Sequence, residues 1–147
     1  MRSFPSGVAV LSLDDDGDPL AITVGSVVSL SLEPPLVGVA VGVQSTMHEP
    51  MRRADRFSLS LLAAGQQAIA QHFARSGVPP LVRWREIPFR PGAAGRLIEG
   101  AVGWLECAKR DELPVGDHTF VVGNVESAAR AGAAWPLVYL EREYVAL

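Results

Sequence analysis

The stretch AITVGSVVSLSLEPPLVGVAVGVQSTMH, residues 21–48, decides which fold and which site this sequence predicts. Residues 28–32 alternate apolar and hydroxyl side chains, the period of two that sends successive side chains to opposite faces of a strand. After the break at Pro34-Pro35, residues 36–43 alternate valines with glycine or alanine. We therefore expect two neighbouring strands, the first with one apolar and one hydroxyl face.

The second strand would carry Gly38, Ala40 and Gly42 on one face. A face without bulky side chains allows close approach to the backbone, either by a flat ligand or by a neighbouring strand that packs tightly. For any single glycine, packing is the simpler explanation. Because three small residues follow a strand that bears hydroxyl groups, the pattern leaves both interpretations open.

Ser45, Thr46 and His48 precede a polar segment, residues 49–55, that is expected to form a short helix. Thr46 and Glu49 have the spacing of a capping box, and the first N–H groups of a helix can bind an anion such as a phosphate. The proline at position 50 fits only the first turn of such a helix. The alternative is an ordinary cap that binds nothing.

The rest of the chain predicts further short strands separated by turns, together with one helix over residues 66–74. Each strand shows an alternating or continuous apolar pattern, and an Asp-Gly turn joins the first two into a hairpin. At least seven strands and two short helices favour a closed antiparallel barrel. The further strands are expected at residues 7–13, 19–24, 56–62, 97–109, 119–128, 137–140 and 144–147.

Residues 75–96 contain four prolines and five arginines, and they predict a long, irregular and basic loop. In an acidic protein such a cluster could attract a phosphorylated dinucleotide. Exposed arginines on a loop more commonly serve solubility. The pattern alone does not choose between these two roles.

Composition excludes several classes of function. The 147 residues suit one domain over 1–147, and a net charge of -3 argues against a nucleic-acid surface, which is normally basic. No apolar run reaches the ~20 residues that a membrane helix needs. The three histidines lack metal-ligand spacing, and the single cysteine, Cys107, is expected to be a small buried residue in a cytoplasmic protein.

The order of the motifs resembles the flavin reductase family of FMN-binding split barrels. These are small NAD(P)H:flavin oxidoreductases that supply reduced flavin to a separate monooxygenase. The resemblance covers nearly the whole chain, and the Pro-Pro-Leu-Val and Gly-Asp-His-Thr runs make it specific. It rests on the runs at residues 4–8, 23–26, 29–37, 45–48, 57–62, 73–74, 104–107, 116–119 and 122–125, followed by Pro136-Leu137 and Tyr139.

The resemblance implies a mainly β, antiparallel, six-stranded Greek-key split barrel that pairs into a homodimer. It also implies FMN, favoured over FAD, as the flavin, and NADH or NADPH as the co-substrate. His118, which Asp117 could orient, would face the flavin and the nicotinamide as the catalytic residue. The residues that match the family's cofactor site are Thr23, Val24, Gly25, Ser26, Ser29, Ala40, Val41, Gly42, Ser45, Thr46, His48, Phe73 and Ala74.

Four departures from the family pattern remove or move hydrogen-bonding groups. They are Gly25 with Val27, Ala21, Met47 in the place of a threonine, and Ser60 in the place of an asparagine. Together with a shortened 75–96 loop, they favour an alternative, a split-barrel protein that binds FMN without oxidising a nicotinamide. A third interpretation is an assembly protein that keeps the barrel and binds no ligand.

Overall fold

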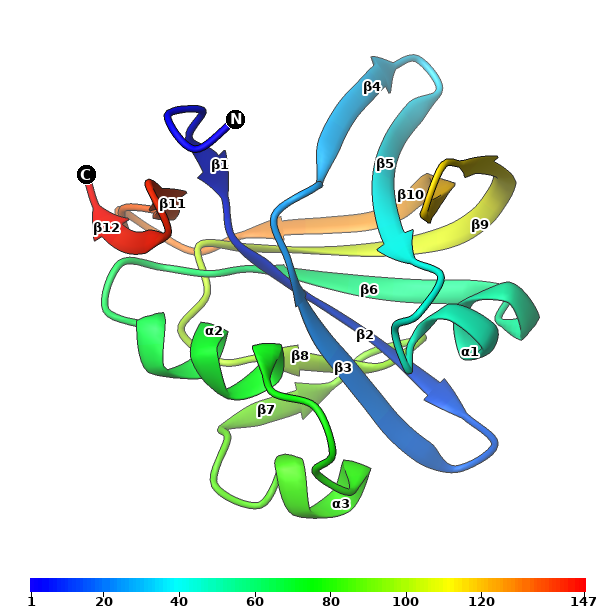
Figure 1. Cartoon of the computed structure of the whole chain (residues 1–147), viewed down its shortest axis with the longest axis horizontal. Coiled ribbons are helices and arrows are strands. Elements are labelled where there is room, and N and C mark those ends of the chain that lie inside the picture. Colours follow the sequence, from blue (N-terminus) through cyan, green and yellow to red (C-terminus); the bar gives the residue numbers. More distant parts are fainter.

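The computed structural model describes residues 1–147 and contains twelve strands and three short helices (Figure 1). Seven strands form one sheet in the order β3-β2-β6-β9-β10-β5-β4, and every neighbouring pair is antiparallel. The strands of this sheet are β2 (Ala9–Asp15), β3 (Asp18–Val24), β4 (Val28–Leu32), β5 (Pro35–Gly42), β6 (Arg56–Leu61), β9 (Gly103–Val115) and β10 (His118–Arg130).

Two smaller sheets and three helices pack around this sheet. One sheet, in the order β1-β11-β12, brings both termini to the same side of the molecule (Figure 1). None of the helices is long and apolar enough to cross a membrane. The remaining elements are β1 (Ser6–Gly7), β11 (Leu137–Leu140), β12 (Glu143–Ala146), β7 (Phe89–Pro91), β8 (Arg96–Ile98), α1 (His48–Arg53), α2 (Gln67–Ala74) and α3 (Pro80–Arg83).

Strand β6 alternates apolar and serine side chains, a pattern that predicts a half-buried strand, but the structure buries both of its faces. Phe57 and Leu59 pack in the main hydrophobic cluster, while Ser58 and Ser60 on the opposite face are equally buried. The reason is that β8 covers the serine face, where the N–H of Ile98 donates to Ser60 Oγ at 3.0 Å. The alternation shows which side chains are polar, but it cannot show that a strand distant in the sequence covers them.

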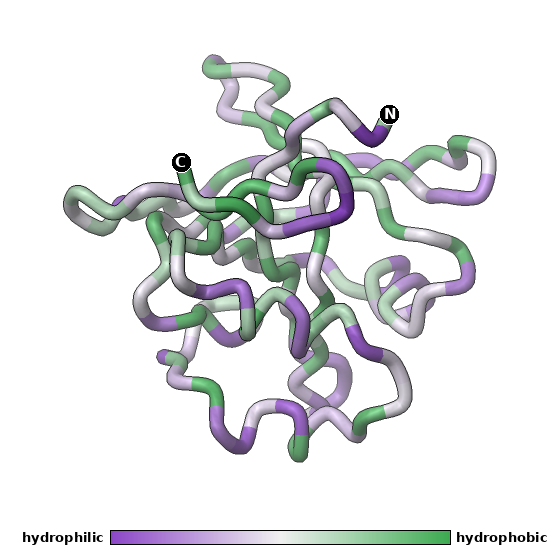
Figure 2. The backbone as a smooth tube through the Cα atoms, turned by 60° about the vertical axis from the view of Figure 1, so that its left-hand side comes forward, coloured by the Kyte–Doolittle hydropathy of each residue, from purple (hydrophilic) through white to green (hydrophobic).

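The β4–β5 hairpin projects from the body of the molecule (Figure 1). Val28, Leu30 and Leu32 of β4 are 41%, 45% and 89% exposed, so the chain leaves much of the predicted apolar face uncovered. In Figure 2 hydrophilic segments gather on the outer turns, whereas this projecting hairpin carries hydrophobic stretches. An uncovered apolar strand of this kind is typical of a surface that meets another protein.

The predicted strand over residues 97–109 is interrupted, and residues 75–96 are more ordered than predicted. A turn at Gly100, whose φ is +79°, separates β8 from β9. Strand β9 then runs on to Val115 and forms a hairpin with β10 in which each strand has 13 residues. Within residues 75–96, helix α3, strand β7 and the first residue of β8 replace part of the expected irregular loop.

Every methionine and cysteine side chain except that of Met1 is buried in the main hydrophobic cluster. Met47, Met51 and Cys107 are each 1% exposed. Burial raises the pKa of the Cys107 thiol to about 12, and the carboxylates of Glu126 and Glu106 add to the shift. The prediction that Cys107 is a small buried residue is confirmed.

Gly123 of β10 allows the sheet to close on the core. A Cβ added there would lie 2.5 Å from Cζ of Phe57 and 2.9 Å from Cβ of Cys107. Real carbon atoms do not approach so closely, and both neighbours are fully buried. The register of β10 on β9 also shifts between Val122 and Gly123.

We predict that Gly123→Ala lowers the free energy of unfolding by about 1 to 3 kcal/mol, the usual cost of overpacking a core. Urea unfolding followed by circular dichroism measures it. The control is Gly132→Ala, where an added Cβ meets no atom within 4 Å. Equal stability of the two variants would show that the core accommodates the methyl group.

Candidate active site

The site begins with the pairing of β5 and β10. His118 lies opposite Gly42, and Phe120 lies opposite Ala40, so these four residues share one face of the sheet. Phe120 covers Gly38, because a Cβ at Gly38 would lie 2.2 Å from Cζ of the phenylalanine. The small face is therefore used in two ways: it packs against an aromatic ring at Gly38 and stays open at Ala40 and Gly42.

A cavity of about 470 Å³ lies over the open part of this face. It is bounded by the end of β3, the end of β5, the turn before α1 and the end of α2. Twelve of the fourteen predicted site residues line it: Thr23, Val24, Gly25, Ser26, Ala40, Val41, Gly42, Ser45, Thr46, Phe73, Ala74 and His118.

Ser29 and His48 do not line this cavity. Ser29 lies on the projecting strand β4, where it pairs with Val37. His48 lines a different depression, and its Nε2 is 2.7 Å from Oγ1 of Thr119. The sequence could not separate these two from the others, because only the direction of each side chain decides which cavity it lines.

Two of the predicted hydroxyl groups are held by the backbone. Thr23 donates to the carbonyl of Ala70 at 2.6 Å, which joins β3 to α2. Ser26 donates to the carbonyl of Ala40 at 3.0 Å and accepts from the N–H of Ala40 at 3.1 Å. These hydroxyls shape the walls of the cavity by holding its elements together.

The turn between β5 and α1 forms one corner of the cavity. The predicted capping box is wrong, since α1 starts at His48 with Met47 as its N-cap and without a side-chain cap. Ser45 Oγ instead accepts from the N–H of Met47 at 3.1 Å. The backbone N–H groups of Gln44 and Thr46 make no hydrogen bond within the protein, and neither does the Thr46 hydroxyl. The N–H of Ser45 between them donates to the Gly42 carbonyl at 3.0 Å, so this turn has two free N–H groups that could bind an anion.

His118 stands at the first position of β10 beside this corner. Its Nδ1 lies 2.7 Å from Oδ1 of Asp117, so the ring donates to the carboxylate. That hydrogen bond holds the pKa of Asp117 below its usual range. Nε2 has no protein partner and lies 3.9 Å from the position of a Cβ added to Gly42. The expected orientation of the imidazole by Asp117 is therefore present in the structure.

Five further residues line the cavity that the sequence did not assign to the site: Ile22, Gln44, Arg75, Ser76 and Arg83. Arg83 is only 8% exposed, and its guanidinium donates to the carbonyls of Ala21 at 3.2 Å and Arg75 at 2.6 Å. Phe73 is also buried, and its ring packs 4.7 Å from that of Trp84. It is thus both an anchor of α2 and a wall of the cavity.

The arginines of residues 75–96 are not simply a solubilising cluster. Arg90 stacks over Trp104 with its guanidinium carbon 4.1 Å from the ring centroid. Arg96 stacks over Phe89 at 4.1 Å and near Trp84 at 5.5 Å. Such contacts between a cation and an aromatic ring contribute to packing. Proximity of an arginine and an aromatic ring in space is not visible in their order along the chain.

A family model described as a flavin reductase-like domain matches residues 1–147. The chain belongs to this family. It is 38% identical over 136 residues to an NADH-dependent FAD reductase of Streptomyces globisporus, covering 90% of this chain and 72% of that protein. It is 37% identical over 147 residues to the reductase component of 4-hydroxyphenylacetate 3-monooxygenase of Thermus thermophilus, covering 98% and 90%.

Solved structures of flavin reductases share the whole fold of this family member. The flavin reductase component of a bacterial two-component tryptophan halogenase superposes with a TM-score of 0.93 at 34% identity, covering 99% of this chain and 92% of that one. An NADH:FAD oxidoreductase of Streptomyces globisporus, solved with NAD and FAD fragments, gives 0.92 at 34% identity, covering 98% and 86%. The prediction of a mainly β, antiparallel split-barrel fold is confirmed.

We predict that Ser26→Ala lowers the free energy of unfolding by about 1 to 3 kcal/mol, because it leaves the N–H and C=O of Ala40 without their partner. Urea unfolding measures the loss. Ser29→Ala is the matched control, since the Ser29 hydroxyl makes no hydrogen bond within the protein and lies on an exposed strand. If both variants are as stable as the parent, water replaces the Ser26 hydrogen bonds without a loss in the free energy of unfolding.

Proposed function

We propose that this protein is an NAD(P)H-dependent flavin reductase that binds FMN or FAD and supplies reduced flavin to a separate monooxygenase. One observation carries the proposal: the cavity joins a floor of small residues, a corner of free N–H groups and a histidine held by a carboxylate. The named activities of the relatives support it. We infer that residues 1–147 act as one flavin-binding domain.

The residues present fit a flavin. Ala40 and Gly42 leave room for a flat ring, and the free N–H groups of Gln44 and Thr46 suit a phosphate. Val24 and Gly25 would border the ring at the end of β3, and Phe73 and Ala74 would border it at the end of α2. A bound flavin supplies the ability to accept a hydride, so the protein needs no nucleophile of its own.

His118 would position the nicotinamide. Its Nδ1 is occupied by Asp117, which leaves Nε2 directed at the mouth of the cavity as an acceptor in the neutral ring and as a donor in the protonated ring. The imidazole is 48% exposed, which leaves it accessible to a second ligand that enters after the flavin. This arrangement suits a residue that acts during hydride transfer more than during flavin binding.

We further propose a homodimer in the cytoplasm. The exposed apolar side chains of β4 would be covered by a second copy of the chain, since a long apolar hairpin left in water favours association. The one thiol, buried and unpaired, is compatible with a reducing compartment.

Nicotinamide oxidation with added flavin tests the activity. We expect the purified protein to oxidise NADH or NADPH only when FMN or FAD is present, as measured by the loss of nicotinamide absorbance. A protein that binds flavin and does not oxidise either nicotinamide would support the alternative, an FMN-binding split barrel without turnover.

We predict that Thr46→Val weakens FMN binding roughly 10-fold or more, because a hydrogen bond to a charged phosphate contributes about 1.5 to 3 kcal/mol. Equilibrium dialysis measures the dissociation constant. Riboflavin, which has no phosphate, is the control ligand, and its affinity should stay unchanged. An equal loss for both ligands would place the phosphate elsewhere.

We predict that His118→Ala keeps flavin affinity and slows flavin reduction by roughly 10- to 1,000-fold, equivalent to about 1.4 to 4 kcal/mol of the barrier. Anaerobic stopped-flow absorbance measures the rate. Asp117→Asn, which keeps the imidazole and removes its charged partner, should give a smaller decrease. An unchanged rate in His118→Ala would mean that His118 is only a turn residue.

A further inference from the structure

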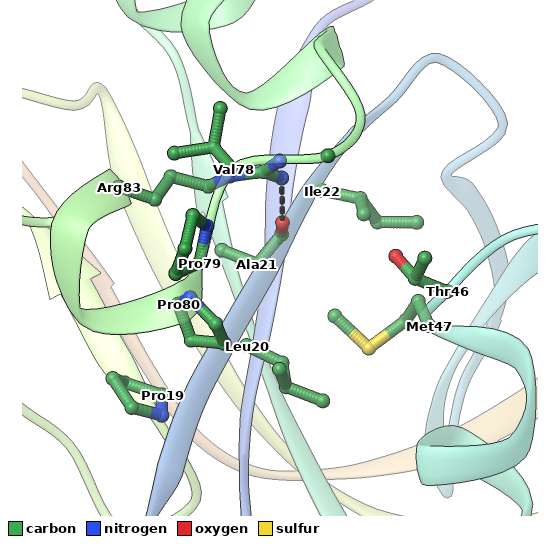
Figure 3. A pocket seen from close by; sticks show the side chains of 11 residues that line it. Pro19, Leu20, Ala21, Ile22, Thr46, Met47, Val78, Pro79, Pro80 and Arg83 are labelled. Atoms are coloured by element: carbon green, nitrogen blue, oxygen red, sulfur yellow. Dashed lines mark hydrogen bonds between the residues drawn. The ribbon is translucent and has the colours of Figure 1, made fainter.

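A second cavity of about 290 Å³ adjoins the first along β3 (Figure 3). The two cavities share three lining residues, Ile22, Thr46 and Arg83. In Figure 3 the Arg83 guanidinium lies on one side, bonded to the Ala21 carbonyl, and Thr46 lies across from it. A ligand that occupies the first cavity can therefore extend past Thr46 into the second.

Arg83 is a buried cation without an anion. Two of its nitrogen atoms donate to backbone carbonyls, its buried Nε has no partner, and no carboxylate forms an ion pair with it. Burial lowers the pKa of its guanidinium. A buried charge is costly unless it is paired, so a structure that keeps one at the edge of a cavity is arranged for a negatively charged ligand.

We propose that the second cavity holds the adenosine half of FAD, with the pyrophosphate between Thr46 and Arg83, and that the protein therefore prefers FAD to FMN. This inference rests on the proposed function. It departs from the sequence resemblance, which favours FMN, because it depends on a cavity and an unpaired guanidinium that only the fold brings together.

The lining suits an adenine. Leu20, Met47, Val78 and Pro79 provide apolar surface, while Thr46 and Arg83 provide the polar groups. Cofactor sites commonly combine apolar walls with a few polar groups, in volumes of roughly 300 to 1,000 Å³. FMN would end at its single phosphate near Thr46, whereas the second phosphate of FAD could reach the planar guanidinium.

A nicotinamide dinucleotide carries the same adenosine and pyrophosphate, so it is the other source of this chemistry. Thr46 lines both cavities, and we propose that it binds the phosphate of the flavin. That phosphate would therefore lie where the two cavities meet, which favours FAD as the ligand of the second cavity. In FAD that phosphate is bonded to a second phosphate, which carries the adenosine. A nicotinamide that enters on the His118 side would have to cross the flavin to reach the second cavity.

Equilibrium dialysis without nicotinamide tests the inference. We expect the parent protein to bind FAD roughly 10-fold or more tightly than FMN. Val78→Trp fills the second cavity and should weaken FAD roughly 10-fold or more, with FMN unchanged to within about 2-fold. Leu81→Trp is the matched control, because Leu81 is 64% exposed on α3 and does not line the cavity.

Arg83→Lys adds a test of the guanidinium itself, since it keeps the charge and removes the planar fork. We expect it to weaken FAD and to leave riboflavin binding unchanged. Arg83 also donates to the carbonyls of Ala21 and Arg75, so its substitution can change the local packing. Val78→Trp leaves these hydrogen bonds in place and tests the cavity independently of them.

Three outcomes would overturn the assignment. Equal affinities for FMN and FAD in the parent, or equal effects of Val78→Trp on both flavins, would show that the second cavity holds no part of the flavin. A raised KM for NADH in Val78→Trp, with FMN as the flavin, would assign the cavity to the nicotinamide. If one of these outcomes is found and the parent protein still binds and reduces FMN, only the assignment of the second cavity is wrong. If the parent protein binds neither flavin, the proposed function is wrong.

Discussion

The hydrogen bonds between the Ser26 hydroxyl and the Ala40 backbone are the constraint on which the site depends. Strand β4 pairs with β5 only as far as Gly38, so beyond it this edge of β5 has no neighbouring strand. An unpaired edge must find other partners, and here one serine side chain binds both polar groups of Ala40. A further strand would satisfy the same groups, but its side chains would fill the space over Ala40 and Gly42. The Ser26 hydroxyl therefore binds the free backbone groups of Ala40 and leaves the face over Ala40 and Gly42 open.

The register of β10 on β5 then divides this face into a packed part and an open part. Phe120 fills the space over Gly38, while His118 stands beside Gly42 at the rim. A shift of one residue would turn the buried valines Val39 and Val41 towards the cavity, because side chains alternate between faces. Core packing and the shape of the cavity are thus fixed by the same set of backbone pairs.

Most of the strands, and most of the residues that line the candidate site, could be predicted from the sequence, because alternation and the order of motifs depend on residues close together in the chain. Residues 81–84 show why the rest could not. Leu81 and Val82 are exposed, whereas Arg83 and Trp84 are buried, the reverse of what hydropathy predicts. The cause is tertiary: Trp84 donates to the Pro19 carbonyl, and Arg83 donates to that of Ala21. No signal within a short helix of four residues indicates that strand β3 lies against it.

The burial of sulfur has a consequence for the durability of the protein. Reduced flavin reacts with oxygen and yields peroxide, so a protein that releases it works in contact with an oxidant of its own making. Oxidation of cysteine requires an accessible thiolate, and oxidation of methionine converts an apolar side chain in a core into a polar one. Cys107 is protonated and enclosed, and Met47 and Met51 lie in the same cluster. Apart from Met1, which is fully exposed, the chain offers peroxide no sulfur atom at its surface.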